Sequence, residues 1–72
     1  MVRPFDVHTF GRNLRALRKA KGLSQEGFAH VARLDRTYVG GIERGERNPG
    51  LKAIIQLAEG LEVEVAELFK AS

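Results

Sequence analysis

Apolar residues recur at helical spacing along the chain and predict a series of short helices. Phe10, Leu14 and Leu17 form an i, i+4, i+7 stripe over residues 7–20, which is the pattern of a helix with one buried face. Asp6 is a suitable N-cap for this first helix. The chain shows no strand pattern that is long enough or has a partner, so the first prediction is an all-α fold.

Two further helices follow, separated by a very short turn. Ser24 is a good N-cap for a second helix that reaches about residue 32. Asp35 can cap a third helix over about residues 35–44, and Gly45 can close it. Two short helices joined in this way form the geometric core of a helix-turn-helix unit, although many three-helix bundles share the pattern.

The C-terminal third predicts two more helices. The fourth is expected over residues 51–59, with Gly60 as its stop, and the fifth over residues 64–69. The fifth helix is expected to bury three apolar side chains, Val65, Leu68 and Phe69. The whole chain then forms a compact five-helix bundle, in which residues 7–72 are one domain and residues 1–6 a short N-terminal arm.

The composition indicates which kind of partner the protein binds, but it does not indicate a reaction. The 72 residues include no cysteine and carry a net charge of +3. Residues 1–49 hold ten Lys or Arg against five Asp or Glu, whereas residues 50–72 hold two Lys and four Glu. A basic front half favours a polyanionic partner, although solvated surface charge explains it equally well. No secretory signal or membrane-spanning run is visible, so we expect a cytoplasmic protein without membrane contact.

Enzyme chemistry is not indicated. His8 and His30 stand alone, and no cluster has the spacing of metal ligands. The chain has only two serines, Ser24 and Ser72, and no nucleophile–base arrangement or glycine-rich phosphate loop can be found. We therefore expect no catalytic residues, no metal and no cofactor.

The residues of the two central helices carry a more specific signal. They are Gly22-Leu23-Ser24-Gln25-Glu26, Phe28-Ala29, Leu34-Asp35-Arg36-Thr37-Tyr38-Val39 and Ile42-Glu43-Arg44-Gly45-Glu46-Arg47-Asn48-Pro49. This run resembles the XRE type of helix-turn-helix regulators, the family of Cro and the phage repressors, and in particular the controller proteins of restriction–modification systems. The resemblance covers nearly the whole chain, from Phe10 to Phe69. It implies a repressor-like domain that binds double-stranded DNA with sequence specificity and regulates transcription.

Three positions depart from the family pattern. Arg33 stands where a glycine is usual, and a left-handed conformation there costs a non-glycine residue roughly 1 kcal/mol or more. Gly27 replaces the glutamate of a capping box, and Gly50 replaces a serine cap. These changes predict modest stability rather than a different fold.

The resemblance places residues 35–44 in the major groove as the recognition helix. The N-terminal residues of such a helix reach base edges, which here are Arg36 and Thr37. The residues expected to surround them, mainly as phosphate contacts, are Ser24, Gln25, Tyr38, Arg44, Arg47 and Asn48. Tyr38 is expected either to clamp a phosphate or to pack in the core. Gly41 falls at a base-reading position without a side chain. The pair Gly40-Gly41 either lets the helix sit deep in the groove or is merely tolerated on an exposed face.

The resemblance also implies a structural ion pair and a partner. Arg18 and Glu43 are expected to join the first helix to the recognition helix. One recognition helix reads few base pairs, so we expect a homodimer on a partly palindromic operator, formed through the apolar residues of segment 51–69. An antitoxin or another protein-interaction module built on the same domain remains the alternative, and RNA binding is a weaker third, because no aromatic stacking platform is present.

Overall fold

The computed structural model describes residues 5–70, so only Phe5 and Asp6 of the expected N-terminal arm are seen. The five helices are α1 (Val7–Ala20), α2 (Gln25–Ala32), α3 (Arg36–Glu43), α4 (Leu51–Leu61) and α5 (Val65–Leu68). The all-helical prediction is confirmed, and no strand occurs within residues 5–70. None of the helices in this part of the chain is long and apolar enough to cross a bilayer.

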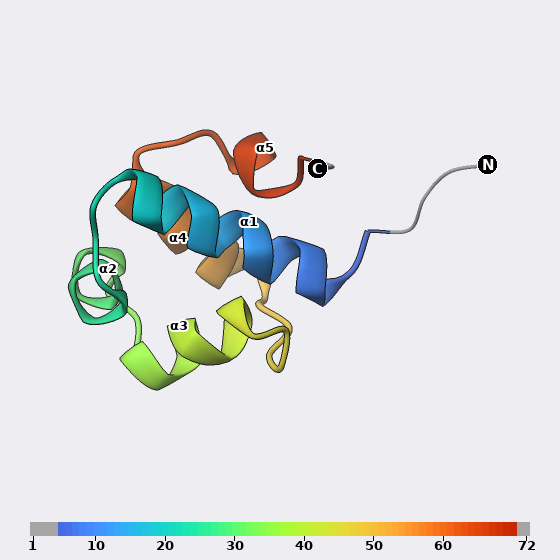
Figure 1. Cartoon of the computed structure of the whole chain (residues 1–72), viewed down its shortest axis with the longest axis horizontal. Helices are drawn as coiled ribbons and strands as arrows, with labels where there is room; N and C mark the ends of the chain where they lie inside the picture. Colours follow the sequence, from blue (N-terminus) through green and yellow to red (C-terminus); the bar gives the residue numbers. More distant parts are fainter. Residues whose placement is uncertain (1–4, 71–72) are drawn as a thin grey trace.

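α1 runs across the middle of the molecule in Figure 1. α1 contacts both α3 and α5, and these two helices lie on opposite sides of it in Figure 1. α2 packs against both α3 and α4, and α4 also contacts α5. The fold therefore holds α3 at one side of the molecule and the C-terminal helix at the other.

Short polar side chains begin the first three helices, as the sequence predicted. Asp6 accepts a hydrogen bond from the backbone N–H of Thr9 at 2.9 Å. Ser24 accepts from the backbone N–H of Gly27 at 3.0 Å, and Asp35 accepts from that of Thr37 at 2.8 Å. Each cap satisfies one backbone donor that the first turn of a helix leaves without a partner.

The first four helices all end through a residue in the left-handed conformation. Gly22 and Gly45 fill this position after α1 and α3, and Arg33 fills it after α2 with φ of 60°. The prediction that Gly60 stops α4 is wrong, because α4 continues to Leu61 and Glu62 turns left-handed with φ of 59°. Gly60 stays helical and serves packing: a Cβ there would lie 3.1 Å from a methyl carbon of α2.

The core consists of apolar side chains from all five helices. Those with no exposed surface are Leu14, Phe28, Val39, Ile42, Leu57, Leu61 and Leu68. Of the three residues expected to be buried in α5, only Leu68 is, whereas Val65 and Phe69 are 39% and 43% exposed. A four-residue helix can turn only one side inward, and the ring of Phe69 lies 5.2 Å from that of Phe10 at the edge of the core.

Two amide side chains tie helix ends to the body of the fold. Asn13 donates from α1 to the backbone oxygens of Leu68 and Lys70, at 2.9 and 2.8 Å. Gln56 donates from α4 to the carbonyl of Ala32 at 3.0 Å, at the end of α2. These bonds satisfy carbonyls that helix ends leave open, and they fix α5 and the α2–α3 turn in place.

Candidate nucleic-acid interface

The α2–α3 pair exposes one face of α3 and buries the other. Val39 and Ile42 on the inner face are fully buried, and Ala29 of α2 is 3% exposed. Arg36 and Thr37 are exposed at the start of α3. The core therefore holds α3 rigidly by its apolar side, and its polar side faces outward.

The outer side of α3 forms one wall of a shallow polar pocket of about 210 Å³. Its lining residues are Gln25, Arg36, Thr37, Gly40 and Arg44. Four of these five belong to the nine residues predicted to contact DNA. Two guanidinium groups and a hydroxyl thus gather at one place, which suits an anionic ligand or the acceptor atoms of base edges.

The N-terminus of α2 faces the same region. Ser24 engages the N–H of Gly27, and the N–H of Phe28 bonds to the carbonyl of Ser24 at 2.9 Å. The N–H groups of Gln25 and Glu26 precede the first intrahelical bond, so they are available to an outside acceptor. Together with the positive end of the helix dipole, they favour a phosphate at this position.

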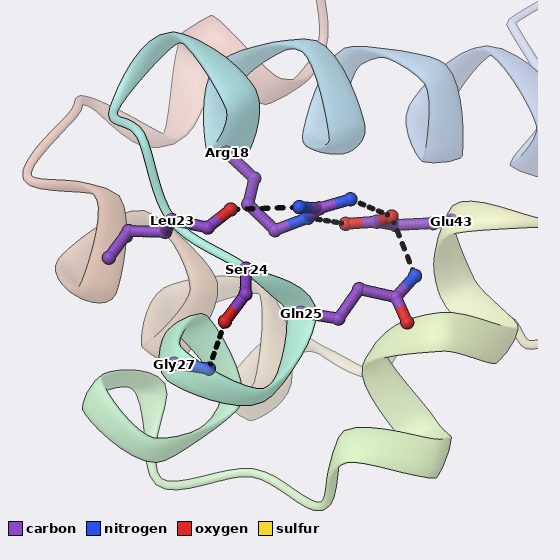
Figure 2. A network of polar contacts seen from close by, with 6 residues as sticks. All are labelled: Arg18, Leu23, Ser24, Gln25, Gly27 and Glu43. Carbon is purple, nitrogen blue, oxygen red and sulfur yellow. Dashed lines mark hydrogen bonds and ion pairs between the residues drawn. The ribbon is translucent and has the colours of Figure 1, made fainter.

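A buried ion pair links α1 to α3 and stabilises this arrangement (Figure 2). The Nε of Arg18 donates to Oε2 of Glu43 at 2.7 Å and its Nη2 donates to Oε1 at 3.0 Å. The third donor, Nη1, bonds to the carbonyl of Leu23 at 2.8 Å. The Glu43 side chain is only 2% exposed, so Arg18 and Glu43, which the resemblance implied as partners, form a buried bidentate pair.

Gln25 belongs to this network as well as to the pocket. Its Nε2 donates to Oε1 of Glu43 at 3.0 Å (Figure 2). Because an ionised carboxylate only accepts hydrogen bonds, the amide nitrogen must face Glu43, and the amide oxygen is left toward α3. The sequence predicted Gln25 as a phosphate contact and gave no sign of this second role.

The pair keeps both of its members charged. Burial by itself raises the pKa of Glu43, but the hydrogen bonds from Arg18 and Gln25 and the positive charges of Arg18 and Arg15 outweigh it, so the pKa lies below the ordinary value. The hydrogen bond to Glu43 raises the pKa of Arg18 despite the opposing effect of burial. Glu43 is therefore a fixed negative charge inside the α1–α3 contact.

The two glycines of α3 are buried, so the interpretation that they are merely tolerated on an exposed face is wrong. A Cβ at Gly40 would lie 3.1 Å from a terminal nitrogen of Arg44 and 3.4 Å from the amide oxygen of Gln25. A Cβ at Gly41 would lie 2.6 Å from Cγ of Arg47. Long polar side chains thus cover both α-carbons on the outer side of the helix.

Two other predicted contacts, Tyr38 and Asn48, lie outside the polar pocket, whereas Arg44 lines it. Tyr38 is half-buried and packs against the core. Arg44 forms an exposed ion pair with Glu46 at 3.1 Å. Asn48 lies apart from the polar pocket, in a groove that also includes Phe5 and Phe69, so the structure does not bring it together with Arg36 and Thr37.

Gly11, which was not predicted from the sequence as a functional position, sets the distance between α1 and α3. A Cβ there would lie 2.6 Å from the carbonyl oxygen of Glu43 and even closer to that of Ile42. The available signal was a glycine inside a helix next to the apolar stripe, because a glycine at such a position often marks a close approach of another backbone.

Comparison with known proteins gives one consistent family. A family model described as helix-turn-helix (HTH_3) matches residues 14–68. The control protein C.MunI from a Mycoplasma species is 48% identical over 61 residues, which cover 83% of this chain and 82% of that protein. YazB of Bacillus subtilis strain 168, named as an uncharacterized HTH-type transcriptional regulator, is 40% identical over 63 residues, covering 88% of this chain and 91% of YazB.

A solved structure agrees in fold and sequence. The crystal structure of C.AhdI, a restriction-modification controller protein from Aeromonas hydrophila, matches with a TM-score of 0.86 at 56% identity. The match covers 88% of this chain and 96% of that one. The chain is thus similar to controller proteins in two independent comparisons.

Proposed function

Because the chain belongs to the helix-turn-helix family HTH_3 and is a sequence-specific DNA-binding regulator of transcription, we propose that it acts as a homodimer on a partly palindromic operator. The relatives are regulators rather than enzymes. Such a protein would act at the nucleoid, in the cytoplasm of a prokaryotic cell or of a cell infected by a phage.

The cationic pocket on the outer side of α3 carries the part of this proposal that concerns DNA contact. Arg36 and Thr37 are exposed at the N-terminal end of α3, where residues of a recognition helix reach base edges. We assign base contacts to these two residues. Arg44, Arg47 and the start of α2 at Ser24 and Gln25 flank them and would contact phosphates, which position the helix in the major groove.

The first prediction concerns Arg36. Replacing Arg36 with alanine is expected to weaken binding to the preferred duplex by roughly 1–3 kcal/mol and to relax the preference at one base pair. Arginine can bond bidentately to guanine, and alanine leaves those acceptors unpaired. The measurement is selection of duplexes from a random pool with each protein, followed by titration of the selected site.

Lys21 supplies the matched control. It also carries one positive charge, but it lies in a groove with Val31 and Glu59, away from α3. Lys21→Ala should keep the selected sequence and change affinity only slightly. If Arg36→Ala selects the same sequence with unchanged affinity, Arg36 does not read a base. If wild-type affinity does not fall with salt, the DNA proposal itself fails, because phosphate contacts release counterions.

Exposed apolar side chains in the C-terminal third support the homodimer. Four of the six large apolar side chains that are exposed in the described part of the chain lie within residues 51–69; they are Leu51, Ile55, Val65 and Phe69. α5 lies across α1 from α3 (Figure 1). An interface here would leave the polar pocket free for DNA, and two-fold symmetry would place each residue in it twice.

The second prediction tests that interface. Wild-type protein is expected to be dimeric, and the double variant Leu51→Glu/Val65→Glu is expected to be monomeric, because it buries four charges in a symmetric contact. Both side chains are exposed, at 72% and 39%, so the monomer fold should survive. Light scattering across a concentration series measures the mass.

Val31→Glu is the matched control, since Val31 is 50% exposed but lies on α2. It should remain dimeric. A wild-type protein that stays monomeric at high concentration, alone and on DNA, would refute the dimer. A double variant that remains dimeric would place the interface elsewhere.

A further inference from the structure

Gly41 lies directly beneath the side chain of Arg47. A Cβ built on Gly41 would lie 2.6 Å from Cγ of Arg47 and 3.7 Å from both its Cβ and its Cδ. The aliphatic part of the arginine therefore runs across the bare α-carbon of the recognition helix. Any side chain at position 41 would occupy the space that Arg47 now fills.

The backbone holds Arg47 at this position. The carbonyl of Gly41 accepts the N–H of Glu46 at 2.8 Å and that of Arg47 at 3.3 Å. Gly45 makes the turn possible, with φ of 77°. The loop after α3 is thus folded back onto the helix that precedes it, and residue 47 is anchored to the same peptide group that its side chain covers.

Arg47 differs from the other arginines near α3 in how it is held. Arg44 pairs with Glu46, whereas the Arg47 guanidinium forms no hydrogen bond or ion pair with any residue in the range 5–70. Its aliphatic part is placed by packing while its charge is available. A cation that is already positioned loses less conformational freedom when it binds a phosphate.

We propose that Gly41 is a positioning residue for DNA binding, because its bare α-carbon seats Arg47 on the outer side of α3. The loop arginine then supplies the charge at the place where a recognition-helix side chain would otherwise stand. The inference rests on the proposed function, in which Arg47 contacts a phosphate. This role explains why α3 contains a glycine at position 41, although glycine is the least favourable residue inside a helix after proline.

Gly41→Ala separates this role from an effect on folding. Alanine is the better helix residue. The Arg47 Cβ would stay at an ordinary contact distance of 3.7 Å, so rotation of the exposed Arg47 side chain about its Cα–Cβ bond moves Cγ away, and the melting temperature should change little. DNA binding should nevertheless weaken. If Gly41 served only the fold, the substitution would instead lower stability and DNA binding together.

The experiment compares wild type, Gly41→Ala, Arg47→Ala and the double variant Gly41→Ala/Arg47→Ala on a duplex selected from a random pool by the wild-type protein. Arg47→Ala is expected to weaken binding about ten-fold and to reduce the slope of log affinity against log salt by about one. Gly41→Ala should approach both effects. The double variant should bind like Arg47→Ala, because the arginine that Gly41 seats is already gone.

Other results overturn the inference. Gly41→Ala that binds as tightly as wild type, or that weakens binding by the same factor with and without Arg47, shows that the two residues act independently. If wild type shows no salt-dependent binding to any duplex, the proposed function fails first. An NMR spectrum of free wild-type protein adds a test without substitution. Cross-relaxation between the Gly41 α-protons and the Arg47 Cγ protons is expected, and its absence would refute the contact between Arg47 and Gly41.

Discussion

Replacing Glu43 with alanine is expected to lower the free energy of unfolding by about 3–5 kcal/mol, because the buried charge of Arg18 then loses its carboxylate and keeps only its hydrogen bond to the Leu23 carbonyl. Glu43 accepts two hydrogen bonds from Arg18 and one from Gln25. A domain of 72 residues has a total stability of roughly 4–11 kcal/mol. The melting temperature should therefore fall by about 15 °C or more, which thermal denaturation followed by circular dichroism measures.

Glu46→Ala is the control, since its ion pair with Arg44 is exposed on both sides. Such a pair contributes at most about 1 kcal/mol, so the melting temperature should change by a few degrees. A Glu43→Ala protein that melts within that small range would show that Arg18 and Glu43 behave as separate surface charges.

The same pair predicts sensitivity to acid. The pKa of Glu43 is lowered in the folded protein from the ordinary value of 4.5. Its contribution to stability is therefore complete above about that pH and is lost as the pH falls through the lower value of the folded state. Glu43→Gln, which cannot titrate, should show a flatter decrease of melting temperature in this acidic range than wild type does.

Replacing Gly11 with alanine is the second change with a large expected effect. The new Cβ would lie 2.6 Å from the carbonyl oxygen of Glu43 and closer still to that of Ile42, and backbone atoms cannot rotate away as a side chain can. α1 and α3 must then separate. Overpacking of this kind costs about 1–3 kcal/mol or more. Here it also displaces α3, so both the melting temperature and the DNA affinity should fall.

Gly40→Ala is the stability control for that substitution. A Cβ at Gly40 would meet only the flexible ends of Arg44 and Gln25, at 3.1 and 3.4 Å. Its melting temperature should equal or exceed that of wild type, because alanine is favoured over glycine inside a helix by about 0.5–1 kcal/mol. An equal effect of Gly11→Ala and Gly40→Ala would contradict the close α1–α3 contact.

Local signals along the sequence determined where the helices begin and which side of α3 is exposed. Asp6, Ser24 and Asp35 cap helices because a short side-chain oxygen reaches a backbone N–H two or three residues later, and that depends only on neighbouring residues. The spacing of apolar residues likewise placed Val39 and Ile42 inward. The fold class and the exposed positions of Arg36 and Thr37 followed from such local rules.

The tertiary structure decided the roles of the residues whose partners are distant in the chain. Gly60 looked like a helix stop but packs against α2, and Gly11, Gly40 and Gly41 lie where other parts of the chain approach the helix axis. Gln25 donates to Glu43, which is 18 residues away. A glycine or an amide in the sequence has the same local properties in each case, and only the packing of the helices determines which atoms lie beside it.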